Sequence, residues 1–258
     1  MQYAQIPESQ GITGQAARFG GIFGFKVKGN IVLAVKQTGD DSKGIGAAEP
    51  DAAAFIATNL PLRPAPGLPQ IVIHTATPES GLRRLTGGRN PYWAWCWAGG
   101  LALARHMLAN PALVASRRVL DLGAGSGLVG IAAAKAGAAR VLAVDIDADA
   151  ATAAGLNARA NGVALEAFCA DMLDGPPPAV DVVLVGDLFY DRQTAARTLH
   201  FMDRCLEAGA RVLVGDPRRA FLPLERLDLI ADYPARDFGE SGAGEGRAGV
   251  FAFRAARG

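Results

Sequence analysis

The sequence is poor in the residues that mark metal-binding, disulfide-stabilised or nucleic-acid-binding proteins. It has only three cysteines and three histidines in 258 residues, and its formal net charge is +1. The cysteines lie far apart without a Cys-x-x-Cys pair, which favours a reducing compartment. The histidines show no metal-ligand spacing, so we predict no metal. Long Lys/Arg runs are missing, so we also predict no nucleic-acid partner.

The sequence also lacks long hydrophobic runs. No apolar stretch reaches the roughly 20 residues that span a bilayer, and the N-terminus has no basic segment followed by an apolar one. We therefore predict a cytoplasmic protein without a membrane partner. With 50% hydrophobic and 20% charged residues, the composition is ordinary for a globular chain. It is sufficient for one large α/β domain and a small appendage.

The chain changes character along its length. Its beginning is rich in glycine, and residues 24–36 favour a β-hairpin that turns at Gly29-Asn30. Residues 60–70 are typical of a Pro-rich extended connection, and residues 71–76 favour a strand. We predict three parts: an appendage of unknown role over 1–49, an N-terminal part of the main domain with an aromatic cover over 50–110, and a core over 111–258.

Strands and helices alternate from residue 118 onward. Strands are predicted over 118–122, 140–145, 164–170, 181–187 and 210–216, and helices over 127–137, 147–161 and 192–208. A helix over 99–108 precedes them, and 227–233 and 249–255 favour an antiparallel pair. Such alternation indicates a parallel sheet covered by helices on both faces. We predict an α/β fold with a doubly wound, mostly parallel sheet and an antiparallel C-terminal edge hairpin.

The strongest local signal is VLDLGAGSGLVG (119–130). A buried strand ends there, and Gly123, Gly125 and Gly127 turn the chain into a helix. Glycine tolerates positive φ, and the free N–H groups at a helix start face a ligand. GSGLVG also matches the GxGxxG of NAD-binding proteins, but that match alone is weak. Asp121 stands two residues before Gly123, where a carboxylate crowds a pyrophosphate and suits a cationic ligand.

Acids follow the next two strands. Asp145 ends the second strand about 20 residues after the glycine loop, where an acid can accept both ribose hydroxyls. Its alternative role, capping the following helix, is filled by Asp147. Asp171-Met172 follows the third strand, where the acid can accept from an adenine amino group and the methionine can pack on the ring. For Asp171 alone, a plain loop acid is an equally good interpretation.

The pattern D-x-G-x-G-x-G around Asp121 resembles motif I of the class I S-adenosylmethionine-dependent methyltransferases. That cofactor carries an amino group and a sulfonium and has no phosphate. VLVGDLFYD (183–191) then places Asp187 at the carboxyl end of the fourth strand, in the crevice where open α/β sheets bind ligands. Asp-x-x-Tyr at this place resembles the signature of seven-β-strand protein lysine methyltransferases. A cap of the following helix is the alternative role for Asp187.

Five motifs in order narrow the resemblance: PYWAWCWAGGLALARHML, VLDLGAGSG, DID (145–147), GDLFYD (186–191) and LVGDPRRAFLP (213–223). Together they resemble the family that methylates lysines on the β subunit of electron transfer flavoprotein. The resemblance runs from about residue 50 to the C-terminus. It implies a Rossmann-like seven-stranded sheet, S-adenosylmethionine as cofactor and a protein substrate. Ala98 and Leu101 depart from the family pattern YWA-x-x-WPGGQ.

The resemblance also assigns the stretch NPYWAWCWAGG (90–100), which holds the chain's three tryptophans. It implies that Trp97 covers the cofactor, and that Tyr92 and Trp93 wall the acceptor side with Phe189. Trp95 is better explained as core. Asp187 orients the acceptor amine, and Tyr190 holds its alkyl stem or its ammonium by cation–π contact. The implied cofactor-binding set is Trp97, Asp121, Gly123, Gly125, Asp145, Asp171, Met172 and Asp187.

Several functions stay open on the sequence. The first is a protein-lysine methyltransferase acting on the electron transfer flavoprotein β subunit. The second is an N-methyltransferase for a small amine resembling nicotinamide, or for another protein such as a ribosomal protein. The third is a non-catalytic module with a cofactor fold, against which Asp121, Asp145 and Asp187 argue. A nicotinamide-dependent dehydrogenase fits least, because of the position of Asp121.

Overall fold

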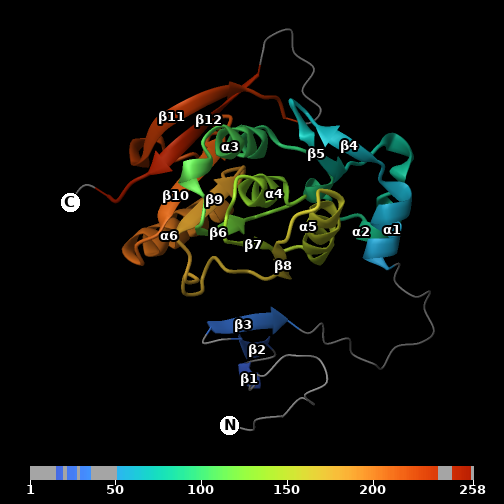
Figure 1. The fold of residues 1–258 in the computed structure, drawn as a ribbon, viewed down its shortest axis with the longest axis horizontal. Coiled ribbons are helices and arrows are strands. Elements are labelled where there is room, and N and C mark those ends of the chain that lie inside the picture. Colours follow the sequence, from blue (N-terminus) through green and yellow to red (C-terminus); the bar gives the residue numbers. More distant parts are fainter. Residues whose placement is uncertain (1–15, 20–21, 28–29, 36–50, 238–245, 257–258) are drawn as a thin grey trace. The chain divides into compact units, whose positions relative to one another are not determined.

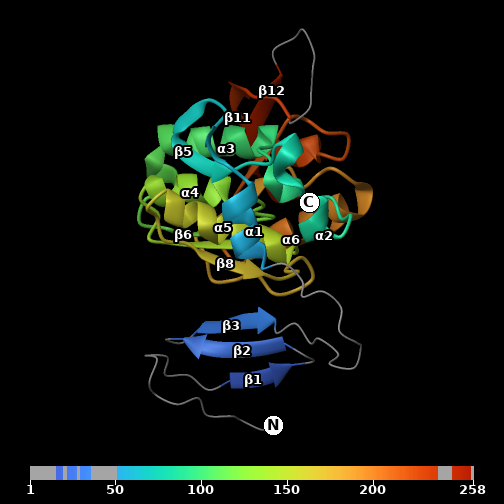
Figure 2. The same cartoon turned by 90° about the vertical axis from the view of Figure 1, so that its right-hand side faces the viewer.

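The computed structural model describes residues 16–19, 22–27, 30–35, 51–237 and 246–256 (Figures 1 and 2). The chain forms two compact units, Met1–Glu49 and Pro50–Gly258. The first contains an antiparallel sheet of β1 (Ala16–Phe19), β2 (Ile22–Val27) and β3 (Asn30–Val35). Val27 pairs with Asn30, so the predicted hairpin is confirmed, with Asn30 in the strand. The residues between them lie outside the described ranges.

The second unit is built on a seven-stranded sheet of order β11-β12-β10-β9-β6-β7-β8. The strands β6 to β10 pair with one another in parallel, and β12 pairs antiparallel with both β10 and β11. This confirms the predicted fold class and its antiparallel edge. The strands are β6 (Arg118–Leu122), β7 (Arg140–Asp145), β8 (Glu166–Cys169), β9 (Val182–Gly186), β10 (Arg211–Asp216), β11 (Leu227–Pro234) and β12 (Arg247–Phe253).

Alternating side chains place the sheet between two hydrophobic layers. In β9, Val182 and Leu184 pack in a cluster with helices α3 and α4, whereas Val183 and Val185 pack in a second cluster with α6. Figure 1 shows α3, α4 and α5 side by side along the sheet. The inner positions of the central strands β6, β7, β9 and β10 are mostly apolar because both faces of the sheet are covered there. The helices are α3 (Ala98–Ala109), α4 (Leu128–Lys135), α5 (Ala148–Ala160) and α6 (Arg192–Glu207).

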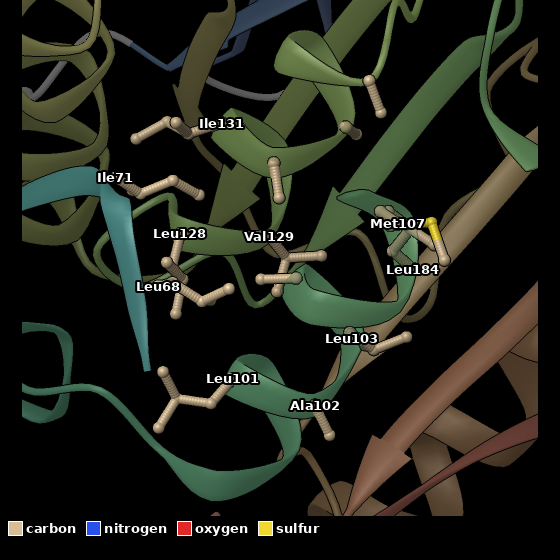
Figure 3. Packing of buried hydrophobic residues seen from close by; sticks show 14 of the residues in the cluster. Leu68, Ile71, Leu101, Ala102, Leu103, Met107, Leu128, Val129, Ile131 and Leu184 are labelled. Carbon is tan, nitrogen blue, oxygen red and sulfur yellow. The ribbon is translucent and has the colours of Figure 1, made fainter. Parts of the chain in front are cut away.

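Helix α3 lies unusually close to the sheet at its first turn. A Cβ on Gly99 would stand 2.1 Å from the carbonyl oxygen of Gly215 in β10. Only a residue without a side chain allows this approach. Further along, Leu101, Leu103 and Met107 are buried, and Figure 3 shows them pointing into the cluster that α3 shares with α4 and β5. Leu101 is 6% exposed, so this departure from the family pattern serves the core.

The segment before α3 contains structure that the sequence did not predict. Residues 62–74 form a hairpin of β4 (Leu62–Ala65) and β5 (Leu68–His74), with Gly67 at positive φ in its turn. The predicted strand over 71–76 corresponds to the second half of β5, whereas β4 and its pairing with β5 were not predicted. The prolines of this segment argue against a hairpin, because proline is uncommon in paired strands. Short elements were also missed: α1 (Ala52–Asn59), α2 (Arg83–Thr86) and single turns at Pro78–Ser80, Tyr92–Ala94, Pro111–Leu113 and Leu224–Arg226. Within the described residues, no helix is long and apolar enough to cross a membrane.

Candidate active site

The glycine loop joins β6 to α4. Gly123, Gly125 and Gly127 all have positive φ, at 66°, 51° and 78°. Gly123 N–H donates to the carbonyl of Val144 at 2.8 Å, which holds the loop against the end of β7. The positive φ values bend the chain sharply between strand and helix, as glycine permits. The loop backbone therefore lines the crevice at the carboxyl end of the sheet.

Asp121 lies under this loop. Its side chain is buried, and Oδ2 accepts a hydrogen bond of 2.7 Å from Gly130 N–H in α4. Burial raises the pKa of this carboxyl to about 7, and the charge of Asp145 acts in the same direction. A buried carboxylate without a cationic partner is costly. A cationic ligand in the pocket would therefore stabilise the ionised form of Asp121.

Asp145 stands at the end of the neighbouring strand. Its Oδ2 accepts from Gly125 N–H at 2.8 Å, and its Oδ1 accepts from Asp147 N–H at 2.9 Å. Burial raises its pKa, although these backbone hydrogen bonds oppose the shift. Asp147 caps α5 by accepting from Asp149 N–H at 2.9 Å, as predicted. Asp145 thus holds the glycine loop against β7, and Asp147 rather than Asp145 caps α5.

A pocket opens beside the glycine loop. Its lining includes two carboxylates, Asp121 and Asp187, and no lysine, arginine or histidine. Lysine and arginine side chains commonly bind phosphate groups, and this lining has carboxylates in their place, so its charge pattern favours a cationic ligand. The lining residues are Tyr92, Trp95, Cys96, Trp97, Gly100, Asp121, Gly123, Ala124, Gly125, Ser126, Leu128, Val129, Gly186 and Asp187.

A row of aromatic rings borders the pocket. The ring centroids of Tyr92 and Trp97 are 6.0 Å apart at 61°, and those of Tyr92 and Tyr190 are 6.2 Å apart at 32°. Trp97 Nε1–H donates to the carbonyl of Tyr92 at 2.8 Å. Tyr92 and Tyr190 are 56% and 54% exposed. The row therefore runs from the lining of the pocket, at Trp97, to an open surface.

Two aromatic residues lie elsewhere than predicted. Trp93 is 3% exposed and packs with Ile56 and Leu60, so it belongs to the core and not to the acceptor side. Phe189 is completely buried in the cluster beneath α6. Trp95, which was expected in the core, packs partly buried against the same cluster as Trp93 and also lines the pocket. Alternation in sequence does not predict which of the three indoles faces inward when the backbone is irregular.

Asp187 follows β9 and has φ of +60°, which is uncommon for a residue other than glycine. Its Oδ1 accepts from Gly99 N–H at 3.0 Å and its Oδ2 from Gly100 N–H at 2.6 Å. Asp187 therefore caps α3, which precedes it. The following helix, α6, is capped by Asp191. Burial raises the pKa of Asp187 to about 6, while Arg219 and the Gly100 N–H oppose the rise.

Arg219 joins the carboxylates around this helix start. Nη1 binds Asp187, and it also lies 3.2 Å from Asp216 Oδ2. Nη2 donates to Asp237 Oδ2 at 2.6 Å, and Asp237 Oδ1 accepts from Ala98 N–H at 2.8 Å. Sequence reasoning missed the roles of Arg219 and Asp237. The GDPRR motif pointed to the region but did not distinguish the two arginines.

Asp171 and Met172 do not line the pocket. Asp171 accepts from Leu173 N–H at 3.1 Å and pairs with Arg197 of α6 at 2.8 Å. Met172 packs against the cluster beneath α6. Their adenine-binding role stays a prediction. Within the described ranges, no group of three or more His, Cys, Asp or Glu side chains is arranged to hold a metal ion.

The sheet order, the glycine loop after β6, the acids Asp121 in β6 and Asp145 at the end of β7, and Asp187 after β9 define a Rossmann-like, class I methyltransferase domain. The family model for ribosomal protein L11 methyltransferase (PrmA) matches residues 106–186. This match runs from α3 to the end of β9 and so includes the glycine loop.

Sequence comparison with known proteins identifies the family more specifically. The electron transfer flavoprotein beta subunit lysine methyltransferase of Xenopus laevis is 37% identical over 67% of this chain and 74% of its own length. The human protein of the same name is 36% identical over 66% and 68%. The Danio rerio protein is 44% identical over 51% and 52%, so the match spans about half of that relative. The chain belongs to the electron transfer flavoprotein beta subunit lysine methyltransferase family.

Proposed function

We propose that the chain is an S-adenosylmethionine-dependent protein-lysine N-methyltransferase whose substrate is the electron transfer flavoprotein β subunit. One observation carries the chemistry: a pocket at a glycine loop with two carboxylates, no cationic side chain and an exposed aromatic border. The names of its relatives suggest the substrate.

The residues of the pocket suit this cofactor. Asp121 and the loop backbone would hold the end that carries the amino group, and Asp145 would accept from the ribose hydroxyls. Asp171 and Met172 would take the adenine side, and Trp97 would cover the cofactor. When bound, S-adenosylmethionine supplies a methyl group that its positive sulfur has already activated. The task left to the protein is to align the acceptor amine with that group.

The acceptor lysine must lose its proton first. A free lysine has a pKa of about 10.4, so fewer than about one in a thousand are neutral at pH 7. Tyr92 and Tyr190 are more than half exposed, and a docked protein would cover both rings and exclude water between them. Desolvation disfavours the ammonium and lowers the lysine pKa. Tyr190 would hold the alkyl stem, or the ammonium before it loses its proton.

Asp187 would orient the amine from the floor of the pocket. An isolated carboxylate there would stabilise the ammonium and raise the lysine pKa. Here its two oxygens accept from Gly99 and Gly100, and Arg219 pairs with one of them. These donors offset the negative charge, so Asp187 can accept a hydrogen bond from the amine with less penalty. The same contacts fix the first turn of α3 beside Trp97.

A labelling experiment tests this function. The protein is incubated with methyl-labelled S-adenosylmethionine and purified electron transfer flavoprotein, and in parallel with a lysate of its host. We expect one labelled band, the β subunit, and no label with Asp187→Ala. Asp174→Ala is the matched control, because Asp174 is exposed and lies outside the pocket lining. An unlabelled β subunit in the presence of active, cofactor-bound protein would exclude this substrate.

The lysate separates the other candidates. The match to a ribosomal protein L11 methyltransferase model favours another protein as the second candidate, which would appear as a different labelled band. Label only in small amines would indicate a small-molecule enzyme. S-adenosylhomocysteine should raise the melting temperature and NAD should not. The cytoplasmic location and the lack of nucleic-acid, membrane and metal partners stay predictions.

A further inference from the structure

A buried ionic cluster lies beneath the first turn of α3. It consists of Arg219 and three aspartates, Asp187, Asp216 and Asp237. Asp216 is the last residue of β10, and the other three lie in the segments that follow β9, β10 and β11. Their side chains are between 0% and 19% exposed. Three carboxylates close together repel one another. Arg219 is the guanidinium that joins all three in these contacts.

The cluster is attached to α3 through its backbone. Ala98 N–H donates to Asp237, and Gly99 and Gly100 N–H donate to Asp187. These are the first three residues of the helix, whose N–H groups have no partner within the helix itself. Trp97 immediately precedes them and donates to the carbonyl of Tyr92. Cluster, helix start and aromatic row therefore form one connected unit.

We propose that Arg219 is a positioning residue for methyl transfer, which holds Asp187 and Asp237 together under α3 and so sets the aromatic row at the pocket. This inference rests on the proposed function for its kinetic part. Arg219 lies behind Asp187 and is absent from the pocket lining, so it acts through Asp187, Asp237 and the helix start.

The guanidinium is suited to this position because its rigid planar fork can bind two carboxylates at once. Nη1 takes Asp187 and Nη2 takes Asp237. The Arg219 backbone N–H also donates to Asp216 Oδ1 at 2.7 Å, which fixes the turn that aims the side chain inward. Lysine offers a single ammonium on a flexible stem and cannot reproduce both contacts with this geometry.

The neighbouring arginine provides a matched control. Arg218 belongs to the same turn but pairs with Asp232 at 3.1 Å and lies over the ring of Phe251. Arg218→Gln and Arg219→Gln remove the same charge one residue apart. Only the second variant takes the guanidinium from the cluster.

Tryptophan fluorescence gives a readout that does not depend on activity. All three tryptophans of the chain lie at positions 93, 95 and 97, so emission and acrylamide quenching report on this stretch alone. We expect Arg219→Gln to shift the emission to the red and to increase quenching. We expect Arg218→Gln to match the unchanged protein. In labelling assays, Arg219→Gln should lower kcat about 100-fold with a smaller change in the acceptor KM.

Two further variants sharpen the test. Arg219→Lys should restore only part of kcat, because it can serve one carboxylate. If Arg219→Gln does not fold, Asp237→Asn can be measured in the same two assays, because it changes only the contacts of Asp237 with Arg219 and Ala98. Its fluorescence should change in the same direction as that of Arg219→Gln. Wild-type fluorescence and wild-type kcat in either folded variant would overturn the proposal.

The test of the Arg219 positioning role can be distinguished from the test of the proposed function. Absence of methyl transfer in the unchanged protein would count against the proposed function, while the fluorescence comparison would still test the positioning role. Transfer in the unchanged protein, with identical fluorescence and identical kcat in all folded variants, would leave the proposed function intact and remove Arg219 from it.

Discussion

At the scale of the residue, the site is defined by carboxylates that are held by backbone donors. Asp121, Asp145 and Asp187 each accept from at least one N–H group of a glycine-rich turn or a helix start. Their pKa values are raised all the same, because burial outweighs those hydrogen bonds. Strongly shifted groups of this kind cluster at functional sites.

Asp121→Asn should stabilise the protein at pH 8. The pKa of Asp121 is raised from 3.8 to about 7, so the folded state holds a proton that the unfolded state has lost. The stability from that proton is complete below about pH 4 and disappears as pH rises through 7. We expect the melting temperature of the variant to exceed that of the unchanged protein by a few degrees at pH 8. The difference should shrink as pH falls towards 5.

The control for this prediction is Asp181, whose pKa is shifted in the opposite direction from that of Asp121. Arg118 lowers the pKa of the partly exposed Asp181 to about 2, and the resulting stability is lost only as pH falls from 4 through 2. Asp181→Asn should therefore lower the melting temperature at pH 8.

S-adenosylhomocysteine should bind Asp121→Asn at least about tenfold more weakly, since a charged acceptor is lost. Titration calorimetry measures this, and unchanged affinity would place Asp121 outside the ligand contacts.

Tyr190 and its neighbour test the aromatic border. Tyr190→Ala removes the ring that faces Tyr92 and should raise the acceptor KM about tenfold, with little change in S-adenosylhomocysteine affinity. Tyr190→Phe keeps the ring and should stay within about threefold of the unchanged protein. Steady-state labelling with varied acceptor measures both. Equal losses in Phe and Ala would assign the role to the hydroxyl.

At the scale of the element, helix α3 connects the core to the site. Its middle packs on α4 and β5 (Figure 3), while its first turn touches β10 and holds the carboxylates. The sequence predicted this helix within a residue or two. It did not predict the hairpin of β4 and β5, because its prolines are typical of loops and its pairing is visible only in three dimensions.

Gly99 and Gly100 make a matched pair for this helix. Gly99→Ala would place a Cβ 2.1 Å from a β10 carbonyl, whereas the nearest atom to a Cβ on Gly100 is 3.6 Å away. We expect Gly99→Ala to lower the free energy of unfolding by about 1–3 kcal/mol through overpacking. Gly100→Ala should be neutral or stabilising by up to about 1 kcal/mol. Urea unfolding compares them, and equal values would contradict this close approach.

At the scale of the whole molecule, the described clusters of buried hydrophobic residues and all the candidate site residues belong to the unit Pro50–Gly258. We expect a chain that begins at Pro50 to keep the melting temperature of this unit and its affinity for S-adenosylhomocysteine. Thermal unfolding with and without the ligand measures this. A loss of affinity greater than about tenfold would assign residues 1–49 a part in binding.

What the sequence determined by itself is local in origin. The apolar period and the capping residues define the helices, buried runs define the parallel strands, and glycine spacing defines the loop after β6. These features depend on neighbours a few residues apart, and they are enough to predict the fold class and the places of Asp121, Asp145 and Asp187.

Tertiary structure decided which side chains meet. Asp237 reaches Ala98 across 139 positions, and Arg219 reaches Asp187 across 32, so no local pattern distinguishes them from surface ion pairs. The same holds for Trp93, Trp95 and Phe189, because packing against distant segments determines whether a ring enters the core or the pocket. The sequence thus specified the elements and the chemical groups, and close packing of segments far apart in the chain selected the partners of each group.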